Sequence, residues 1–129
     1  MLRGTKTQAE LGQKGEWIAV SFLKNEGYRI IAVNYRTRLG QIDIVAKDKG
    51  TVCFVEVKTR RSQRFGKPAE AVGVFKQRKI SQVALAFLKQ NGLLNSPARF
   101  DVVSIFHQET QPQVELIKNA FELDYNYTY

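Results

Sequence analysis

Several kinds of residue and segment are scarce in this 129-residue chain, and each scarcity excludes a class of protein. The single cysteine, Cys53, cannot form an internal disulfide, which agrees with a reducing compartment. The single histidine, His107, excludes a zinc site built from several imidazoles. No apolar run approaches the roughly 18 residues that a membrane-spanning helix needs. We therefore expect neither a disulfide-stapled protein nor a membrane protein.

Signals for export and for repeated architecture are also missing. The N-terminal stretch MLRGTKTQAELGQKGEW carries charges but no apolar block followed by a small-residue cleavage site, so we expect a cytoplasmic protein. Low-complexity tracts and internal repeats are absent as well. The length suits one core, which predicts a single domain over residues 1–129. Its end, residues 122–129, is expected to be a flexible or partner-contacting tail.

Acidic residues are scarce relative to basic ones, with 12 Asp and Glu against 20 Lys and Arg and a formal net charge of +8. The excess is concentrated at residues 53–79, where eight basic and two acidic residues supply +6 of the total. Such a block favours a polyanionic partner, nucleic acid first and an anionic membrane surface second. A solvated surface that keeps the protein soluble is an equally good interpretation of charge alone.

Hydrophobic periodicity predicts two helices and four or five strands. The first helix is expected at about residues 7–26, with Gly27 placed to end it, and the second at residues 75–90, or from Pro68 in a longer alternative. Strands are expected at residues 28–36, 41–47, 51–59 and 99–106, with a shorter one at 113–117. The charged stretch KDKG, residues 47–50, suits a hairpin turn. The order α-β-β-β-α-β predicts an α/β fold in which helices flank a mixed sheet.

Two acids and a lysine, Asp43, Glu56 and Lys58, lie inside the apolar runs of the predicted hairpin instead of at their ends. With the charged turn as the loop, Asp43 faces Phe54 and Gln41 faces Glu56. Because side chains alternate between faces, these five residues emerge on one side, with Asp43 and Glu56 as diagonal neighbours roughly 7 Å apart or a little less. The opposite side is expected to be core and collects Ile42, Ile44, Cys53, Val55 and Val57.

The two carboxylates need a positive charge nearby. Close carboxylates repel each other, and in a partly apolar setting this raises one pKa unless a cation lies between them. Lys58 could provide that cation as an ordinary ion pair. A divalent metal is the other candidate, because Mg²⁺ prefers carboxylate, carbonyl and water oxygens. An exposed ladder of cross-strand charges is the alternative interpretation, but the apolar residues around the acids make unpaired charges there costly.

Glu16 is a third acid with a defined place, on the first predicted helix. It shares a stripe with Gly12, Ala19 and Leu23, because residues three or four apart lie on the same side of a helix, so it should border an apolar face. Gly12 and Gly15 each cost about 1 kcal/mol inside a helix and would let it approach another backbone closely. An outward-pointing Glu16, with glycines that mark a fraying helix start, is the alternative.

Four further residues are assigned to structure and not to chemistry. Cys53 falls on the core side of its strand and is expected to be small apolar filling. Trp17 and Phe22 are expected in the core and not as surfaces on which bases stack. His107 is expected in a loop.

Glu16 on a helix, Asp43 on one strand and the run Glu56-Val57-Lys58 on the next resemble the core of the PD-(D/E)XK nuclease superfamily, whose fold has the same order of elements. Within that superfamily the chain is similar to the YraN-like family of uncharacterised bacterial proteins and, more distantly, to archaeal Holliday-junction resolvases. The likeness runs through GEWIAVSFLKNEGYRIIAVNYR, GQIDIVAKD, FVEVKTRRSQRFGKPAEAV, KQRKISQVALAFL, RFDVVSI and IKNAF. It implies a restriction-endonuclease-like α/β core.

The resemblance implies metal-assisted hydrolysis of phosphodiester bonds, with DNA as the expected substrate and branched structures as candidates. Asp43, Glu56 and the main-chain carbonyl of Val57 would hold Mg²⁺ or Mn²⁺, with Glu16 contributing directly or through water. Lys58 would orient the nucleophile and stabilise the transition state. Further phosphate contacts are expected from Arg60, Arg61, Arg64, Lys76 and Lys79, although surface charge alone is the alternative for the last two. Related junction enzymes often act as homodimers, but nothing in the sequence locates a symmetric interface.

One position departs from the family pattern. YraN-like proteins usually have glutamate where this chain has Gln41, and the amide removes charge from the site and should weaken metal binding, although its oxygen can still coordinate or hold a water. Three functions therefore stay open. They are a Mg²⁺-dependent nuclease, a nucleic-acid-binding protein that keeps the nuclease fold without the chemistry, and an interaction protein that uses its sheet edge or its tyrosine-rich tail.

Overall fold

A computed structural model describes residues 8–60, 72–107 and 111–122 of the chain. The elements follow the order α1 (Gln8–Asn25), β1 (Arg29–Thr37), β2 (Gly40–Asp48), β3 (Thr51–Arg60), α3 (Val74–Gln90), β4 (Ala98–His107) and β5 (Pro112–Phe121). This is the predicted order. Neither helix in the described ranges is long and apolar enough to cross a membrane.

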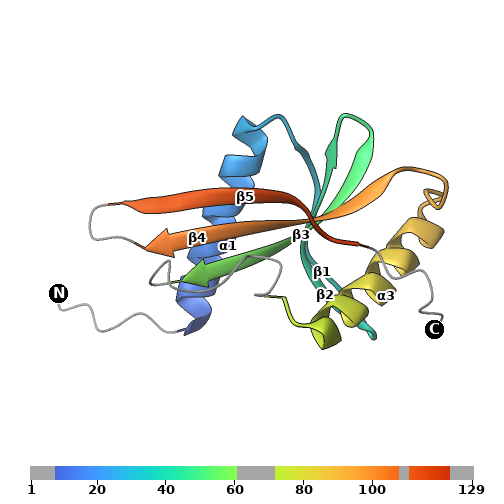
Figure 1. Ribbon diagram of the computed structural model, residues 1–129, viewed down its shortest axis with the longest axis horizontal. Helices are drawn as coiled ribbons and strands as arrows, with labels where there is room; N and C mark the ends of the chain where they lie inside the picture. Colours follow the sequence, from blue (N-terminus) through green and yellow to red (C-terminus); the bar gives the residue numbers. More distant parts are fainter. Residues whose placement is uncertain (1–7, 61–71, 108–110, 123–129) are drawn as a thin grey trace.

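The five strands form one twisted sheet in the order β1-β2-β3-β4-β5 (Figure 1). β3 and β4 run parallel, whereas the other three pairs of neighbours are antiparallel. Parallel neighbours need a long crossover, and α3 belongs to the segment that joins them. The predicted α/β fold with a mixed sheet flanked by helices is confirmed, and the arrangement is consistent with a restriction-endonuclease-like core.

A helix covers each face of the sheet (Figure 1). Along β3, Cys53 and Val55 pack in one cluster with Leu23 of α1, whereas Phe54 packs in a second cluster with Val83 of α3. Successive residues of a strand point to opposite faces, so a central strand between two helical layers is buried on both sides. The predicted core side is confirmed for Ile44, Cys53 and Val55, but the side expected to hold the charged cluster also contains core, because Phe54 is buried there under α3.

The turn between β2 and β3 is shorter than predicted. It consists of Lys49 and Gly50, both with positive φ (52° and 95°), as two-residue hairpin turns that match strand twist require. Asp48 consequently stays in its strand, and Ala46 lies opposite Cys53 instead of Thr51. The predicted register is wrong by two residues, and because the side-chain period is also two, side chains paired across β2 and β3 keep a common face.

β2 is irregular at Asp43. Ile42 belongs to the cluster under α3, whereas Ile44 belongs to the cluster under α1, so the prediction that both point to one face is wrong. The pairing of β2 with β3 extends only to Ile44 and Val55, whereas its pairing with β1 continues to Gly40. β2 therefore leaves β3 near Asp43, and the alternation of side chains breaks at the same place.

α1 ends and packs through two glycines. Gly27 has a φ of +95°, and the N–H of Tyr28 donates to the Leu23 carbonyl at 2.9 Å, which closes the helix C-terminus as predicted. Gly15 faces β3 so closely that a Cβ at this position would lie 2.5 Å from Thr59 Oγ1. Gly15 therefore allows a close contact as predicted, but the contact is with the Thr59 side chain and not with another backbone. The surroundings of Gly12 lie outside the described side chains.

β5 is longer than the short strand that was predicted. It pairs with β4 from His107–Pro112 to Phe100–Phe121, with an irregularity next to Asn119, whose φ is 54°. A bulge lets the strand continue beyond the point where its alternation fails. The backbone of His107 is therefore paired in β4, and its expected place in a loop is wrong.

Two expected features fall partly or wholly outside the described residues. α3 begins at Val74 and residues 72–73 are not helical, so the helix does not extend back through them. Residues 61–71 and the tail at 123–129 are not described.

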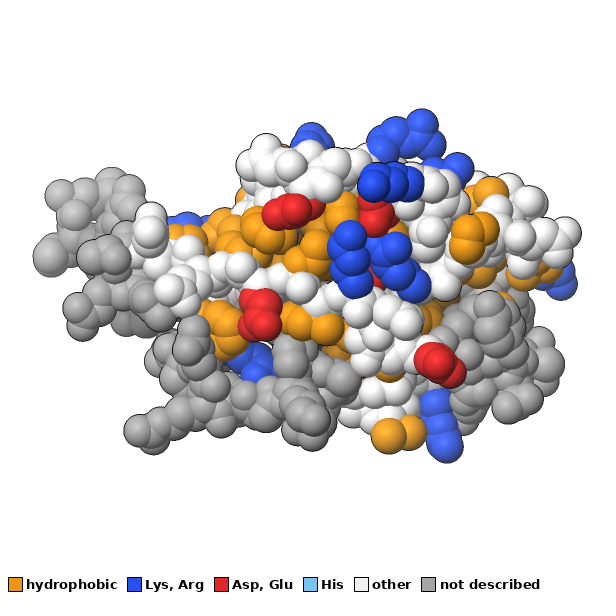
Figure 2. Space-filling model, turned by 45° about the horizontal axis from the view of Figure 1, so that its top comes forward, with side chains coloured by type: hydrophobic (Ala, Val, Ile, Leu, Met, Phe, Trp, Pro, Cys, Tyr) orange, Lys and Arg blue, Asp and Glu red, His pale blue; other side chains and the backbone are white. Residues whose placement is uncertain are grey.

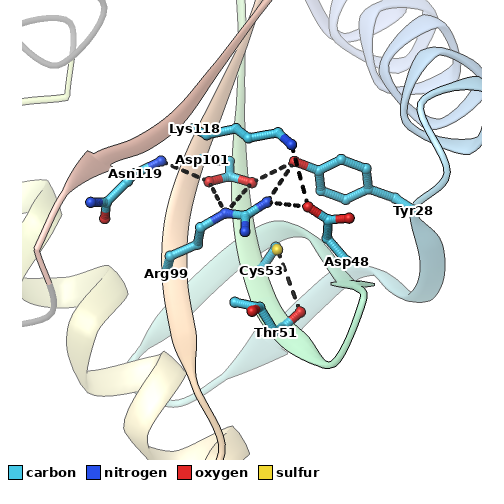
Figure 3. Close-up of polar contacts among 8 residues, drawn as sticks. All are labelled: Tyr28, Asp48, Thr51, Cys53, Arg99, Asp101, Lys118 and Asn119. Carbon is cyan, nitrogen blue, oxygen red and sulfur yellow. Dashed lines mark hydrogen bonds and ion pairs between the residues drawn. The ribbon is translucent and has the colours of Figure 1, made fainter.

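A network of polar side chains connects neighbouring elements at the end of the sheet that contains the β2–β3 turn (Figure 3). Asp101 is fully buried and accepts hydrogen bonds from Tyr28 Oη at 2.9 Å and from Arg99 Nε at 3.0 Å. It also accepts from the N–H of Asn119 at 2.9 Å, and Arg99 Nη2 donates to Asp48 at 2.7 Å. The network thus connects the end of α1, the β2–β3 hairpin, β4 and β5.

Burial and hydrogen bonding shift the pKa values of the residues in and beside this network. Burial and then Asp101 raise the pKa of Tyr28, so its hydroxyl stays protonated and acts as a donor. Burial lowers the pKa of Arg99, but hydrogen bonds to Asp48 and Asp101 more than reverse that effect. Cys53 lies nearby and donates weakly to the Thr51 carbonyl (Figure 3), and burial raises the pKa of its thiol to about 12. Its predicted role as buried filling is confirmed.

Candidate functional site

Asp43 lies where β2 leaves β3, and its carboxylate takes over part of the missing main-chain pairing. The N–H of Val57 donates to Asp43 Oδ2 at 2.8 Å. The printed pairs of the two strands end at Ile44–Val55, and Phe54 pairs with Val45, so the predicted pairing of Asp43 with Phe54 is wrong. Asp43 nevertheless lies close enough to Glu56 to raise its pKa, and both acids line one pocket.

Asp43 and Glu56 open into a pocket with a volume of about 310 Å³ between the hairpin and α3. Its lining comprises Gly40, Gln41, Asp43, Glu56, Lys76 and Lys79. Figure 2 shows a face of the molecule on which acidic, basic and exposed hydrophobic side chains occupy the same central region. The pocket brings two carboxylates from neighbouring strands together with two lysines from a helix.

Glu56 is an acid with a raised pKa, and only 5% of its surface is exposed. Burial, and then the neighbouring Asp43 carboxylate, raise the pKa of Glu56, and an ion pair with Lys76 opposes this rise. Burial lowers the pKa of Lys76, but its bond to Glu56 raises it above the ordinary value. The expected repulsion between two carboxylates is present, and the cation bonded to Glu56 is Lys76 of α3.

Lys58 lies two residues beyond Glu56 on β3 and is half-buried. Burial, and then the neighbouring Lys76 ammonium, lower the pKa of Lys58, whereas Glu56 and Asp43 act in the opposite direction. The charges of Lys76, Glu56 and Asp43 therefore all act on the ammonium group of Lys58. Its lowered pKa makes it a readier proton donor than an ordinary lysine.

Glu16 connects to Asp43 through two amide side chains. Asn34 Nδ2 donates to Glu16 Oε2 at 2.9 Å, and Gln41 Nε2 donates to Asn34 Oδ1 at 3.1 Å. The same Gln41 nitrogen lies 3.4 Å from Asp43 Oδ1 and donates to it. Gln41 is thus placed between Asn34 and Asp43, and its predicted position opposite Glu56 is wrong because the register is shifted.

Sequence reasoning missed Asn34. It lies in β1 with a φ of 55°, a left-handed conformation that asparagine tolerates better than most residues. A lone amide inside the apolar run IIAVNYR was the available signal. Pairing with the neighbouring strand, which brings Gln41 within reach, was needed to give it a role.

Trp17 was expected in the core, but 73% of its surface is exposed. Ala19 and Leu23 form the buried side of α1, and Trp17 points away from that stripe. The expectation is wrong because the helix buries only one side. Phe22 is partly buried at the edge of the same stripe.

The predicted phosphate contacts occupy three settings. Arg60 is partly buried at the end of β3, and Lys79 Nζ lies 5.3 Å from the centre of the Phe75 ring. Lys76 pairs with Glu56, which the sequence did not indicate. Arg61 and Arg64 lie outside the described residues.

The donor set for a metal ion is small. Within residues 14–60, 72–106 and 111–122, no three His, Cys, Asp or Glu side chains group closely enough to hold one. Asp43 and Glu56 supply two carboxylates, and the Val57 backbone adjoins both. Mg²⁺ commonly takes one or two protein carboxylates and completes its ligands with water and substrate phosphates. The residues present fit a hard cation bound together with a substrate.

Known proteins match most of the chain. The sequence model of the uncharacterised protein family UPF0102 matches residues 15–105. A UPF0102 protein of Geobacter metallireducens is 52% identical over 115 residues, which cover 89% of this chain and 94% of the relative. A UPF0102 protein of Geotalea uraniireducens is 50% identical over 116 residues, which cover 89% of this chain and 91% of the relative. The matched range contains Glu16, Asp43, Glu56 and Lys58.

Proposed function

The chain belongs to the uncharacterised protein family UPF0102, and from this premise we propose that it is a metal-dependent endonuclease of the PD-(D/E)XK type. The proposed reaction is hydrolysis of phosphodiester bonds in nucleic acid, with DNA as the expected substrate and branched structures as candidates. The observation that carries the proposal is the meeting of Asp43 and Glu56 in one pocket beside lysines. Membership in a family of uncharacterised bacterial proteins, which the sequence resemblance implied, is confirmed.

Asp43 and Glu56 are the proposed ligands of Mg²⁺ or Mn²⁺, together with the main-chain carbonyl of Val57. A bound divalent ion would lower the pKa of a water and neutralise charge on the scissile phosphate. The raised pKa of Glu56 supports this assignment, because burial, and then the Asp43 carboxylate, raise it more than the neighbouring lysines lower it, as at many functional sites. The hydrogen bond from Val57 holds Asp43 in place before any ion arrives.

Lys58 and Glu16 have supporting roles in the proposal. Lys58 orients the attacking water and stabilises negative charge that develops on the phosphate. Glu16 acts at a distance, because its hydrogen bonds run through Asn34 and Gln41 to Asp43. Lys76 leaves Glu56 for a phosphate oxygen when substrate and cation enter the pocket.

The proposed partner is nucleic acid, held through its phosphates by the basic block. Lys79 lines the pocket, and Arg60 ends the strand that carries Glu56. Arg61 and Arg64 follow Arg60 in the sequence and are proposed as further phosphate contacts. A homodimer stays a proposal that size measurement in solution would test.

The test is cleavage of a panel of duplex, flap, junction and RNA substrates with Mg²⁺ or Mn²⁺. Asp43→Asn and Glu56→Gln should each lower the rate at least about 100-fold, since loss of even an outer partner of a metal site costs 10- to 100-fold. Glu115→Gln removes the same charge from an exposed position on β5 and should leave the rate unchanged. Absence of cleavage on every substrate, with Asp43→Asn indistinguishable from the parent, would contradict catalysis.

A nucleic-acid-binding protein without catalysis is the second candidate, and the ion pair between Lys76 and Glu56 favours it because an internal cation already balances that acid. Gln41 favours it too, since the amide brings no charge. This candidate predicts salt-sensitive binding that persists in EDTA. Binding should then weaken in Arg60→Ala and Arg61→Ala but not in Glu56→Gln.

A further inference from the structure

A groove lies beside the candidate pocket, between α1 and β1. It has a volume of about 380 Å³ and is lined by Glu16, Trp17, Val20, Val33 and Asn34. Trp17 and Val33 are 73% and 44% exposed, so the groove presents apolar and aromatic surface to solvent. Glu16 and Asn34 add an acceptor and an amide to the same lining. The groove therefore combines an aromatic surface with hydrogen-bonding groups.

We propose that this groove binds one unpaired nucleobase of the substrate, with the indole of Trp17 as the stacking surface. The inference rests on the proposed function and specifies its substrate class. A nucleobase has flat apolar faces and a polar edge, and stacking on aromatic side chains is how proteins commonly hold unpaired bases. Asn34 and Glu16 line the groove and are the polar groups proposed to meet that edge.

Continuity with the pocket supports a nucleotide as the occupant. Asn34 belongs to the groove, and the Gln41 that donates to it also donates to Asp43. A base in the groove would thus lie next to the phosphodiester that the pocket is proposed to cleave. Lys14 is exposed on α1, three residues before Trp17 and on the same side of the helix, where it can contact a backbone phosphate.

The size of the groove suits a small ligand group. Its volume of about 380 Å³ falls within the range of small-ligand sites, about 300–1,000 Å³. The formal net charge of +8 also favours a polyanion over a neutral peptide.

Selectivity for non-duplex nucleic acid follows from this arrangement. A base inside a duplex is stacked on both faces and reaches the groove only after unstacking, which costs a few kcal/mol. An unpaired base at a flap, gap or junction avoids that penalty. The groove would therefore direct cleavage to phosphates next to unpaired nucleotides.

Trp17 is the only tryptophan in the chain, so its fluorescence reports directly on the groove. The full chain in EDTA is titrated with a duplex that carries a single-stranded overhang, and with the same duplex whose overhang is abasic. Binding is followed independently by the anisotropy of a labelled strand. Quenching of Trp17 by the overhang with bases, and a much smaller effect with the abasic overhang, is the expected result.

Affinity provides the second readout. Trp17→Ala should weaken binding of the overhang about 10- to 100-fold, as expected for loss of one stacked base, and should leave blunt duplex binding unchanged. Trp17→Phe should retain most of the affinity. Leu94→Ala truncates a large hydrophobic side chain that lies outside the groove and is 56% exposed. It should not change the affinity for either the overhang or the blunt duplex.

Three results would overturn the inference. They are equal quenching by both overhangs, unchanged affinity in Trp17→Ala, and Trp17 emission that shifts with protein concentration alone, which would show a second copy of the chain in the groove. Loss of cleavage with retained quenching contradicts only the proposed catalysis. Cleavage without quenching contradicts only the inference.

Discussion

Glu56 is a carboxyl group that is buried, lies near another acid and has one lysine as its ion-pair partner. Burial and Asp43 raise its pKa above the ordinary value of 4.5. A carboxyl whose folded pKa lies above its unfolded pKa binds more protons when folded, so the free energy of unfolding falls as pH rises through that interval. Ionised Glu56 therefore opposes folding at neutral pH, as residues retained for chemistry often do.

Glu56→Gln should raise the midpoint of thermal unfolding at neutral pH. The amide removes the buried charge, so the gain should disappear below pH 4.5, where the parent carboxyl is protonated in both states. Thermal unfolding followed by circular dichroism over a pH series, without divalent metal, would measure the difference in midpoint between the variant and the parent. Glu115→Gln, which makes the same change at an exposed position, is the matched control. Destabilisation by Glu56→Gln at neutral pH would mean that the pair with Lys76 outweighs burial.

Lys76→Met should tighten binding of Mn²⁺ to the protein alone, because the ion would no longer compete with an ammonium group for Glu56. Loss of one competing ion pair worth about 1 kcal/mol corresponds to a gain of roughly fivefold to tenfold in affinity. Isothermal titration with MnCl₂ is the measurement. Lys79→Met removes the other lysine of the pocket, and its smaller effect serves as the comparison. Equal affinities in the parent and Lys76→Met would contradict competition.

At the scale of elements, the contact of α1 with β3 depends on a missing side chain. Gly15 is buried, and a Cβ there would lie 2.5 Å from Thr59 Oγ1. α1 also carries Glu16, the next residue, so the same contact sets how far that carboxylate lies from the strands. Packing and site geometry are linked at this crossing.

Gly15→Ala should lower the free energy of unfolding by about 1–3 kcal/mol through overpacking against Thr59. The double variant Gly15→Ala, Thr59→Ala should recover most of the loss, because the clashing hydroxyl is removed and alanine favours the helix by about 1 kcal/mol. Urea denaturation of the four members of the cycle measures the coupling. Additive effects would show that the clash is relieved elsewhere.

The β2–β3 hairpin shows how local chemistry and register interact. The sequence indicated a turn in KDKG, but a four-residue loop and a two-residue loop both fit that composition. The left-handed conformation of Lys49 and Gly50 decided between them, and Asp48 stayed in the strand as a partner of Arg99. The two-residue turn therefore sets the register, and the bond between Asp48 and Arg99 is compatible with it.

At the scale of the whole molecule, the buried network around Asp101 joins segments that are far apart in the chain (Figure 3). Tyr28 and Asp101 are 73 residues apart, and Arg99 and Asp48 are 51 apart. A fully buried carboxylate is stable only when its charge is paired and its lone pairs are satisfied. The network therefore makes correct assembly of the sheet a condition for burying this acid.

Asp101→Ala should lower the free energy of unfolding by about 3–5 kcal/mol, because Tyr28 and the Asn119 N–H lose their acceptor in the interior. Lys118→Ala provides a contrast within the same network. Its side chain is 55% exposed and lies 3.4 Å from Asp48, so the expected loss is below about 1 kcal/mol. Chemical denaturation of both variants measures the difference. Similar losses would show that burial does not control the energetics here.

The sequence by itself determined the order of the elements, the end of α1 at Gly27 and the side of the strands on which Asp43 and Glu56 meet. Each depends on local periodicity or on the conformation of one residue, and despite a register error of two residues the two acids still meet in one pocket. Only the tertiary structure decided that Lys76 pairs with Glu56, that Asn34 links Glu16 to Gln41 and that Trp17 is exposed. These features depend on how helices dock against the sheet and on where β2 leaves β3, and the energies involved come from groups that are neighbours in space and not along the chain.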